Sequence, residues 1–198
     1  VPIAFDAAQN SRFDYTSSGI ICVNETKFAS YSEKGNKKWS ENVQVQKPYM
    51  EEKNGYILIS SIGDQKICLY KGKKLLYSEK LEDNIVCASL NDNGDVVAVT
   101  EKEYFKARVV VLNKNGKTIF AWDSGSYEIL DAAISNERNV ALSMLNTDTG
   151  AASFITCMDV NGKTKFKTDA FEDTLIYDLF YCGNKLNAIA DSRCISFN

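Results

Sequence analysis

A degenerate repeat of roughly forty residues constrains this chain more than any other feature of its sequence. Each copy has an apolar run, a turn with glycine and lysine, and a second run with an aromatic residue. The turn glycines are Gly35, Gly72, Gly116 and Gly162, and the aromatic residues after them are Trp39, Tyr77, Phe120 and Phe166. Because each copy is one supersecondary unit, the fold must be interpreted one repeat at a time.

Turn chemistry predicts four short strands in each repeat. Asn-Gly between alternating runs is the strongest short hairpin signal, because a tight primed turn needs positive φ. Asn115-Gly116 and Asn161-Gly162 supply this signal. Upstream of the hairpins, further pairs of apolar runs flank a second turn, as at 85–90 and 96–100. We therefore predict an all-β protein, a β-propeller of four-stranded antiparallel blades.

Five repeat units can be counted. They span approximately residues 12–43, 48–81, 84–125, 127–171 and 174–198. The last unit stops where its turn glycine is due, so we expect residues 1–198 to be a single propeller domain or a fragment of a larger propeller. The alternative is a closed five-bladed ring in which Pro2–Phe5 supplies the missing strand, and a β-sandwich is the remaining structural alternative.

Composition excludes several classes of function. The net charge is −3, whereas nucleic-acid binders usually carry a basic surplus, so we expect no nucleic-acid partner. The chain contains no histidine, which removes Ser-His-Asp and Cys-His catalysis and every His-ligated metal site. We find no catalytic, metal or cofactor-binding constellation, and we expect no cofactor and no enzyme activity.

The termini and cysteines bear on localisation. No run of eighteen apolar residues is present, and the chain starts at Val1 without an initiator Met, so we expect a processed product whose signal peptide or anchor lies outside it. The six cysteines form no C-x-x-C pair and lie in apolar runs, where we expect them to be small buried hydrophobes. Free thiols are compatible with the cytosol or with the outside of an anaerobe.

The repeat resembles that of PQQ-like and WD-like propellers. Gly35 followed by Trp39 is similar to the glycine turn and docking tryptophan of PQQ-like repeats, although Trp122-Asp123 follows the fourth strand of its unit rather than ending the third, as the WD signature does. The segments around Phe13-Asp14, Trp122–Gly125, 129–135 and 175–178 resemble an uncharacterised clostridial (Firmicutes) propeller family. That resemblance implies an N-terminal membrane anchor and an extracytoplasmic location.

Asp131 and Asp178 are the candidate site residues. They occupy the same position in units four and five, in the strand that lines the channel of a propeller, and Cys87 is the equivalent residue in unit three. Converging carboxylates could bind a cation or a polyol. The structural interpretation is that they accept hydrogen bonds from backbone amides of the next blade and hold the blades together.

Lysine-rich turns and scattered aromatic residues are two further candidates. The lysines recur once per unit, either as a positive ring facing an anionic surface or as solvated tips that protect strand edges. The aromatic residues could line a binding face, although we expect core packing for at least half of them: Tyr104, Phe105, Tyr127, Tyr177 and Tyr181.

Three functions are compatible with this sequence. The leading one is a non-catalytic interaction or scaffold module, extracytoplasmic and tethered to the membrane by an anchor outside this chain, that binds a protein or cell-envelope ligand. The alternative is a carbohydrate-active or other hydrolytic or lyase enzyme in which Asp131 and Asp178 act as general acid and base. A cytoplasmic scaffold is the third.

Overall fold

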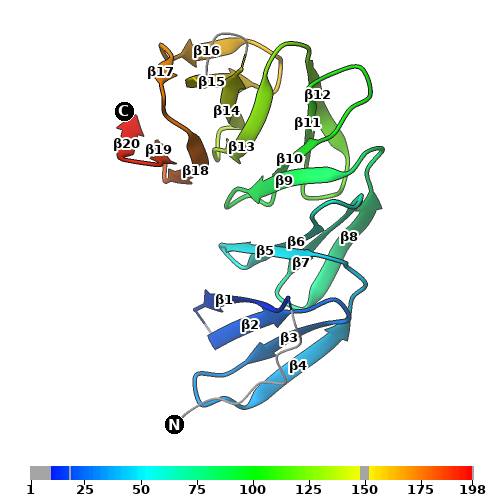
Figure 1. The fold of residues 1–198 in the computed structure, drawn as a ribbon. Helices are drawn as coiled ribbons and strands as arrows, with labels where there is room; N and C mark the ends of the chain where they lie inside the picture. The colour runs from blue at the N-terminus through cyan, green and yellow to red at the C-terminus, as the bar shows by residue number, and fades with distance from the viewer. Residues whose placement is uncertain (1–9, 18, 148–151, 198) are drawn as a thin grey trace. The chain divides into compact units, whose positions relative to one another are not determined.

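The computed structural model describes residues 10–17, 19–147 and 152–197. Within these ranges the chain is entirely β, and its strands form five antiparallel sheets that follow one another along the sequence (Figure 1). This confirms the prediction of an all-β propeller with about five blades. We call the sheets blades 1 to 5 in chain order.

The blades have the following strands. Blade 1 has β1 (Arg12–Thr16), β2 (Gly19–Val23), β3 (Lys27–Tyr31) and β4 (Lys37–Asn42). Blade 2 has β5 (Pro48–Lys53), β6 (Tyr56–Ser61), β7 (Lys66–Lys71) and β8 (Lys74–Lys80). Blade 3 has β9 (Ile85–Leu90), β10 (Val96–Thr100), β11 (Ala107–Leu112) and β12 (Thr118–Ser124). Blade 4 has β13 (Glu128–Ile134), β14 (Asn139–Asn146), β15 (Ala152–Asp159), β16 (Thr164–Lys167) and the short β17 (Phe171–Glu172), which also pairs with β15. Blade 5 has β18 (Ile176–Cys182), β19 (Lys185–Ala190) and β20 (Cys194–Phe197).

Blade 5 has three strands in the part of the chain that the structure describes, as its interrupted repeat predicts. The segment Pro2–Phe5, expected as a fourth strand in the closed-ring alternative, lies outside the described residues. Trp122-Asp123 lies within β12, the fourth strand of its blade, and not after that strand as expected from the sequence.

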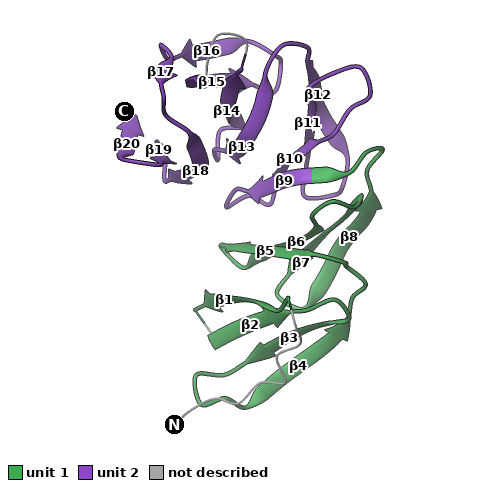
Figure 2. Ribbon diagram, in the orientation of Figure 1, with its two compact units in different colours: residues 1–85 green, residues 86–198 purple. Residues whose placement is uncertain are grey.

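The chain divides into two compact units, residues 1–85 and 86–198 (Figure 2). Unit 1 contains blades 1 and 2, and unit 2 contains nearly all of blade 3 together with blades 4 and 5. The single-domain prediction stays a prediction, and each unit is described below by itself.

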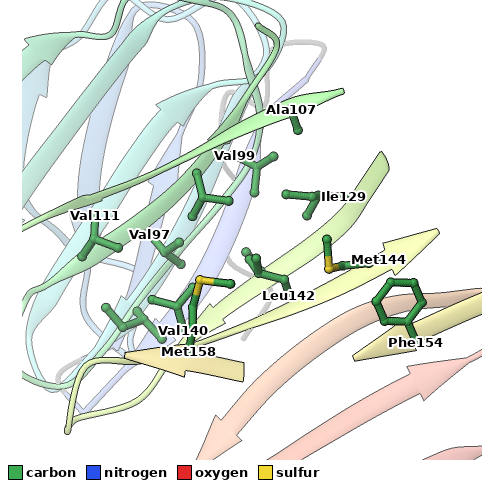
Figure 3. Packing of buried hydrophobic residues seen from close by; sticks show 13 residues of the cluster. Val97, Val99, Ala107, Val111, Ile129, Val140, Leu142, Met144, Phe154 and Met158 are labelled. Carbon is green, nitrogen blue, oxygen red and sulfur yellow. The ribbon is translucent and has the colours of Figure 1, made fainter. Parts of the chain in front are cut away.

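Apolar side chains pack between neighbouring blades within each unit. In unit 2, Val97 and Val111 of blade 3 pack with Leu142 and Phe154 of blade 4 in one buried cluster (Figure 3). A second cluster joins blades 4 and 5, and in unit 1 a third joins blades 1 and 2 around Phe28. Burial of apolar area on both faces of a sheet is what allows such short strands to be stable.

In blades 3 and 4, the turns between third and fourth strands differ from the predicted primed type. At Asn115-Gly116 and Asn161-Gly162 only the glycine has positive φ, 80° in both cases, whereas a type I′ turn needs positive φ at both residues. The Gly116 N–H donates to the carbonyl of Asn113, and the register shifts where each hairpin begins. This is a type I turn with a glycine bulge, the usual geometry of a three-residue loop.

Each blade has two ends with different connections. At the turn end, hairpins join the first strand to the second and the third to the fourth. At the loop end, the second strand joins the third and the blade joins its successor. In unit 1 the loop ends of the two blades lie together, because the linker 43–47 forms hydrogen bonds with both. The Val43 N–H donates to the Thr26 carbonyl of blade 1 at 2.9 Å, and the Lys47 carbonyl accepts from the Ile62 N–H of blade 2 at 3.0 Å.

Candidate functional site

The two predicted site carboxylates occupy equivalent places in neighbouring blades. Asp131 lies in β13 and Asp178 in β18, the first strands of blades 4 and 5. A bulge precedes each one, since the register shifts between Ile129 and Asp131 and between Ile176 and Asp178. A bulge re-aims the neighbouring side chain, so one local irregularity positions both carboxylates. That they line a channel stays a prediction.

Asp131 is bonded to the next blade. Its Oδ2 accepts a hydrogen bond from the Leu179 N–H in β18 at 2.7 Å. Burial raises the pKa of Asp131 to about 6, and the charge of Asp178 adds to this, while the N–H groups of Leu179 and Ala132 act in the opposite direction. The carboxyl group therefore titrates just below neutral pH while it joins two blades.

Asp178 differs from Asp131 in its surroundings. Its side chain is partly buried, and it forms no hydrogen bond with any described residue. It is close enough to Asp131 for the two charges to interact. The structure thus brings the two residues together electrostatically, but only Asp131 has the bond to a neighbouring amide that the structural interpretation requires.

Cys87 occupies the same position in β9 of blade 3. Its thiol donates a hydrogen bond to the Asp131 carboxylate and receives one from the Ala132 N–H of blade 4. Burial, followed by the Asp131 charge, raises the pKa of the Cys87 thiol well above its ordinary value, so the thiol is protonated at neutral pH. Cys87, Asp131 and Leu179 form a hydrogen-bonded chain across three blades.

Blade 1 contributes a residue that sequence reasoning missed. Asp14 of β1 accepts a hydrogen bond from the Glu52 N–H of β5 at 3.1 Å through its Oδ2. The backbone N–H groups that donate these bonds between blades belong to Glu52, Ala132 and Leu179. Each donor directly follows the residue that occupies the equivalent position in its own blade. That rule assigns the position in blade 2 to Glu51. We call this set the first-strand position: Asp14, Glu51, Cys87, Asp131 and Asp178. The signal in the sequence was the place of Asp14 in the first strand of its unit.

The loop between β10 and β11 presents two adjacent aromatic side chains at the loop end of blade 3. Tyr104 is 91% exposed and Phe105 45% exposed. Tyr104 has a φ of 67°, which is strained for a bulky residue, and the turn is closed by the Phe105 N–H to the Lys102 carbonyl at 3.1 Å. The loop base is fixed by a Lys106 N–H bond to the Ser124 carbonyl at 2.8 Å.

The other candidate aromatic residues divide between surface and core. Tyr177 is 56% exposed, whereas Tyr127 packs edge-on against Phe154 with ring centroids 4.9 Å apart. Tyr181 packs in the core of blades 4 and 5, with its hydroxyl 3.7 Å from the Cys157 Sγ. Three of the five are therefore exposed, more than expected, since Tyr104 and Phe105 lie in the loop between β10 and β11 and Tyr177 lies on an exposed face of β18.

Unit 1 has a polar groove at its loop end. Its volume is about 400 Å³, and it is lined by Gln44, Gln46, Asp64, Lys66, Ser78, Glu79 and Lys80. These side chains mix both signs of charge and include no aromatic ring on which a sugar could stack. Among the described residues, no group of three Cys, Asp or Glu side chains is arranged to hold a metal ion.

The comparisons with known proteins agree with this architecture. A family model matches residues 4–198, and the chain belongs to that family, which is described as a family of unknown function (DUF5711). No curated protein matches the sequence significantly. Placement among clostridial or other Firmicutes proteins stays a prediction. Within the described ranges, the structure has no helix whose length and hydropathy would suit a membrane span.

Solved structures with a similar fold are propellers. The WD40 domain of Pan2 from Neurospora crassa has a TM-score of 0.60 at 14% identity, over 90% of this chain and 57% of that one. KlHsv2 with loop 6CD replaced by a Gly-Ser linker has a TM-score of 0.62 at 15% identity, and the match covers 93% of this chain and 64% of that one. BBS1N in complex with ARL6DN has a TM-score of 0.62 at 12% identity, and the match covers 94% of this chain and 63% of that one. The chain thus spans less than two thirds of each of these structures, and at such identities the likeness shows the fold alone.

Proposed function

We propose that this chain is a non-catalytic propeller module that binds another protein through the loop between β10 and β11. The observation that carries the proposal is the exposed pair Tyr104 and Phe105 on a loop held by backbone hydrogen bonds. Exposed tyrosines dominate the energetics of many protein interfaces, and backbone strain is retained where it serves recognition. One similar structure, BBS1N with ARL6DN, is a propeller in complex with another protein, which is compatible with this role.

A site-specific crosslinking experiment tests the proposal. A photoreactive phenylalanine analogue at position 104 of the full-length protein, expressed in its native cells, should give one discrete protein adduct. The same analogue at Tyr177, an exposed position in β18 of the same unit, should not give that adduct.

The affinity of the purified partner provides the second measurement. We expect Tyr104→Ala to weaken binding at least about tenfold, as for a hot-spot residue, and Tyr177→Ala to leave it unchanged. An adduct whose affinity is insensitive to Tyr104→Ala would contradict the proposal, and so would the absence of any adduct at position 104.

One observation favours a second function, hydrolysis or lyase cleavage of a carbohydrate. The pKa of Asp131, about 6, is in the range that a general acid needs, and Asp178 is a nearby carboxylate. The bond from Leu179 to Asp131 argues for a structural role instead. Incubation with labelled cell-wall glycan should give no cleavage. Cleavage that is lost in both Asp131→Asn and Asp178→Asn would establish the enzyme.

We also propose an extracytoplasmic location with an anchor outside this chain, on the basis of the clostridial resemblance. Two exposed free cysteines, Cys182 and Cys194, allow a direct test. A membrane-impermeant maleimide should label them in intact cells, and the Cys182→Ser/Cys194→Ser double variant should lose that labelling. Labelling only after lysis would place the module in the cytoplasm.

A further inference from the structure

The turn end of unit 1 concentrates positive charge. Seven lysines lie on its hairpins and at the end of β5: Lys34, Lys37, Lys38, Lys53, Lys71, Lys73 and Lys74. Two of the nearby glutamates are already engaged, because Glu51 pairs with Lys53 at 2.8 Å and Glu52 accepts the Gly55 N–H at 2.6 Å. With Glu33 of the β3–β4 turn also counted, the seven lysines face three glutamates at this end, a positive surplus on a chain whose net charge is −3.

Four of these lysines have no partner that would neutralise them. The side chains of Lys34, Lys37, Lys73 and Lys74 are exposed and form no ion pair or hydrogen bond with any described residue. Lys71 behaves differently, because its Nζ lies 3.7 Å from the centre of the Tyr56 ring. The four unpartnered lysines occupy the β3–β4 and β7–β8 hairpins, one pair in each blade of the unit.

Exposed apolar and amphipathic side chains accompany these lysines. Leu75 follows Lys74 in β8 and is 47% exposed. Tyr15 of β1 is 62% exposed, and its hydroxyl lies 3.3 Å from Glu33 in the β3–β4 turn, which places the ring at the same end. The turn end of unit 1 thus presents a leucine and a tyrosine among lysines.

The positive surplus is larger at this end of unit 1 than at the other ends described. At the turn end of unit 2, Lys165 pairs with Asp159 at 3.3 Å, and Arg138 binds Asp95 through two nitrogens at 3.0 and 3.1 Å. At the loop end of unit 1, the polar groove combines two lysines with two acidic side chains. Lys114, Lys117 and Lys163 are exposed at the turn end of unit 2 as well, but Asp95, Glu137 and Asp159 lie on hairpins of the same end, so the positive surplus is smaller there.

We propose that the turn end of unit 1 docks on a bilayer surface that contains anionic lipids. Lysine is a flexible point charge without the planar fork that favours bidentate recognition of one phosphate, and several lysines near an anionic bilayer add their attractions. Leucine can enter the boundary between headgroups and acyl chains, where tyrosine rings also accumulate. An acidic peptide or a nucleic acid would use the charge but would leave Leu75 without an apolar partner.

Vesicle co-sedimentation tests the docking surface with the full 198-residue chain. Vesicles of 40% phosphatidylglycerol in phosphatidylcholine should bind the protein at 0.1 M NaCl, and pure phosphatidylcholine vesicles should not. The variant Lys34→Gln/Lys37→Gln/Lys73→Gln/Lys74→Gln should bind at least about 100-fold more weakly, because each lysine near the surface contributes about fivefold. Raising NaCl to 0.5 M should abolish binding by the wild type.

A matched variant separates this surface from overall charge. Gln at the unit 2 turn lysines changes the net charge by the same four units and should leave vesicle binding within about twofold: Lys114, Lys117, Lys163 and Lys165. Leu75→Ser should weaken vesicle binding about threefold or more without changing its salt dependence. The two quadruple variants should unfold within about 4 °C of the wild type, since the substituted side chains are exposed and only Lys165 has an ion pair with a described residue, which is worth little at the surface.

Three outcomes would overturn the proposal. The first is an equal loss of vesicle binding in the two quadruple variants, and the second is an absence of binding to anionic vesicles. The third is tighter binding to polyglutamate or duplex DNA than to vesicles, with the unit 1 lysines required, which would identify a different partner. None of these results depends on Tyr104, so this surface and the proposed protein-binding loop stand or fall separately.

Discussion

At the scale of single residues, three side chains of two chemical kinds join neighbouring blades in the same way. Asp14, Cys87 and Asp131 each accept a hydrogen bond from a backbone N–H in the first strand of the next blade. Both a carboxylate and a thiol sulfur can accept such a bond, though the sulfur does so weakly. This position therefore requires a side chain that can reach the next blade and accept a hydrogen bond, and it does not require a carboxylate.

Asp131 should make stability depend on pH in a defined window. Its pKa rises from 3.8 to about 6 on folding, so the folded state binds more protons than the unfolded state between these values. The free energy of unfolding should therefore fall as pH rises from about 4 to about 6, by at most about 3 kcal/mol from this group. Urea titrations at pH 4, 5, 6 and 7 on wild type and Asp131→Asn measure the effect.

The Asp131→Asn variant should lack this segment of the pH dependence, because its amide does not titrate and can still accept the Leu179 N–H. The wild type should thus lose stability relative to the variant as pH rises. Parallel curves for the two proteins would show that another group is responsible.

Asp14 offers a test of the same contact in unit 1. Asp14→Ala leaves the Glu52 N–H without its acceptor and should lower the free energy of unfolding by about 1–2 kcal/mol. Asp14→Asn keeps an acceptor and should restore most of the loss. Chemical denaturation of both variants measures the difference, and equal destabilisation would mean that the charge rather than the hydrogen bond matters.

At the scale of the elements, the turns between third and fourth strands show how sequence signals can be right about place and wrong about type. Asn-Gly marks the turns, but the first asparagine or aspartate of each loop decides the geometry. Asn113 Oδ1 accepts the N–H groups of Asn115 and Lys117, and Asp159 Oδ1 does the same for Asn161 and Lys163. These side-chain bonds favour a type I turn with a following glycine bulge.

Gly162 should be required for its backbone conformation alone. Its φ is 80°, and an added Cβ would meet only the Phe120 ring at an ordinary 3.8 Å. Gly162→Ala should therefore destabilise the protein by about 1 kcal/mol through backbone strain. Gly125→Ala is the matched control, since Gly125 has open space around it and no positive φ, and its effect should stay within about 0.5 kcal/mol. Thermal denaturation of the two variants compares them, and equal effects would rule out strain as the cause.

At the scale of the whole molecule, the apolar cores described above lie within the two units. Leu142 is fully buried between blades 3 and 4, so Leu142→Ala should cost about 2–5 kcal/mol. We expect hydrogen exchange to accelerate more in β13 to β15 than in β2 and β6 of unit 1, because the cavity weakens only the core of its own unit. Equal acceleration in both units would show that the chain unfolds as one cooperative body.

The sequence by itself determined the class of fold, the number of repeats and the ends of most strands, because period-two apolar patterns and turn residues act locally. It also placed Asp131, Asp178 and Cys87 at one repeated position. It did not reveal Asp14, the exposure of Tyr104 or the unpartnered lysines of unit 1. Those depend on which amide, ring or carboxylate lies beside each residue in space, and only the packing of one blade on the next decides that.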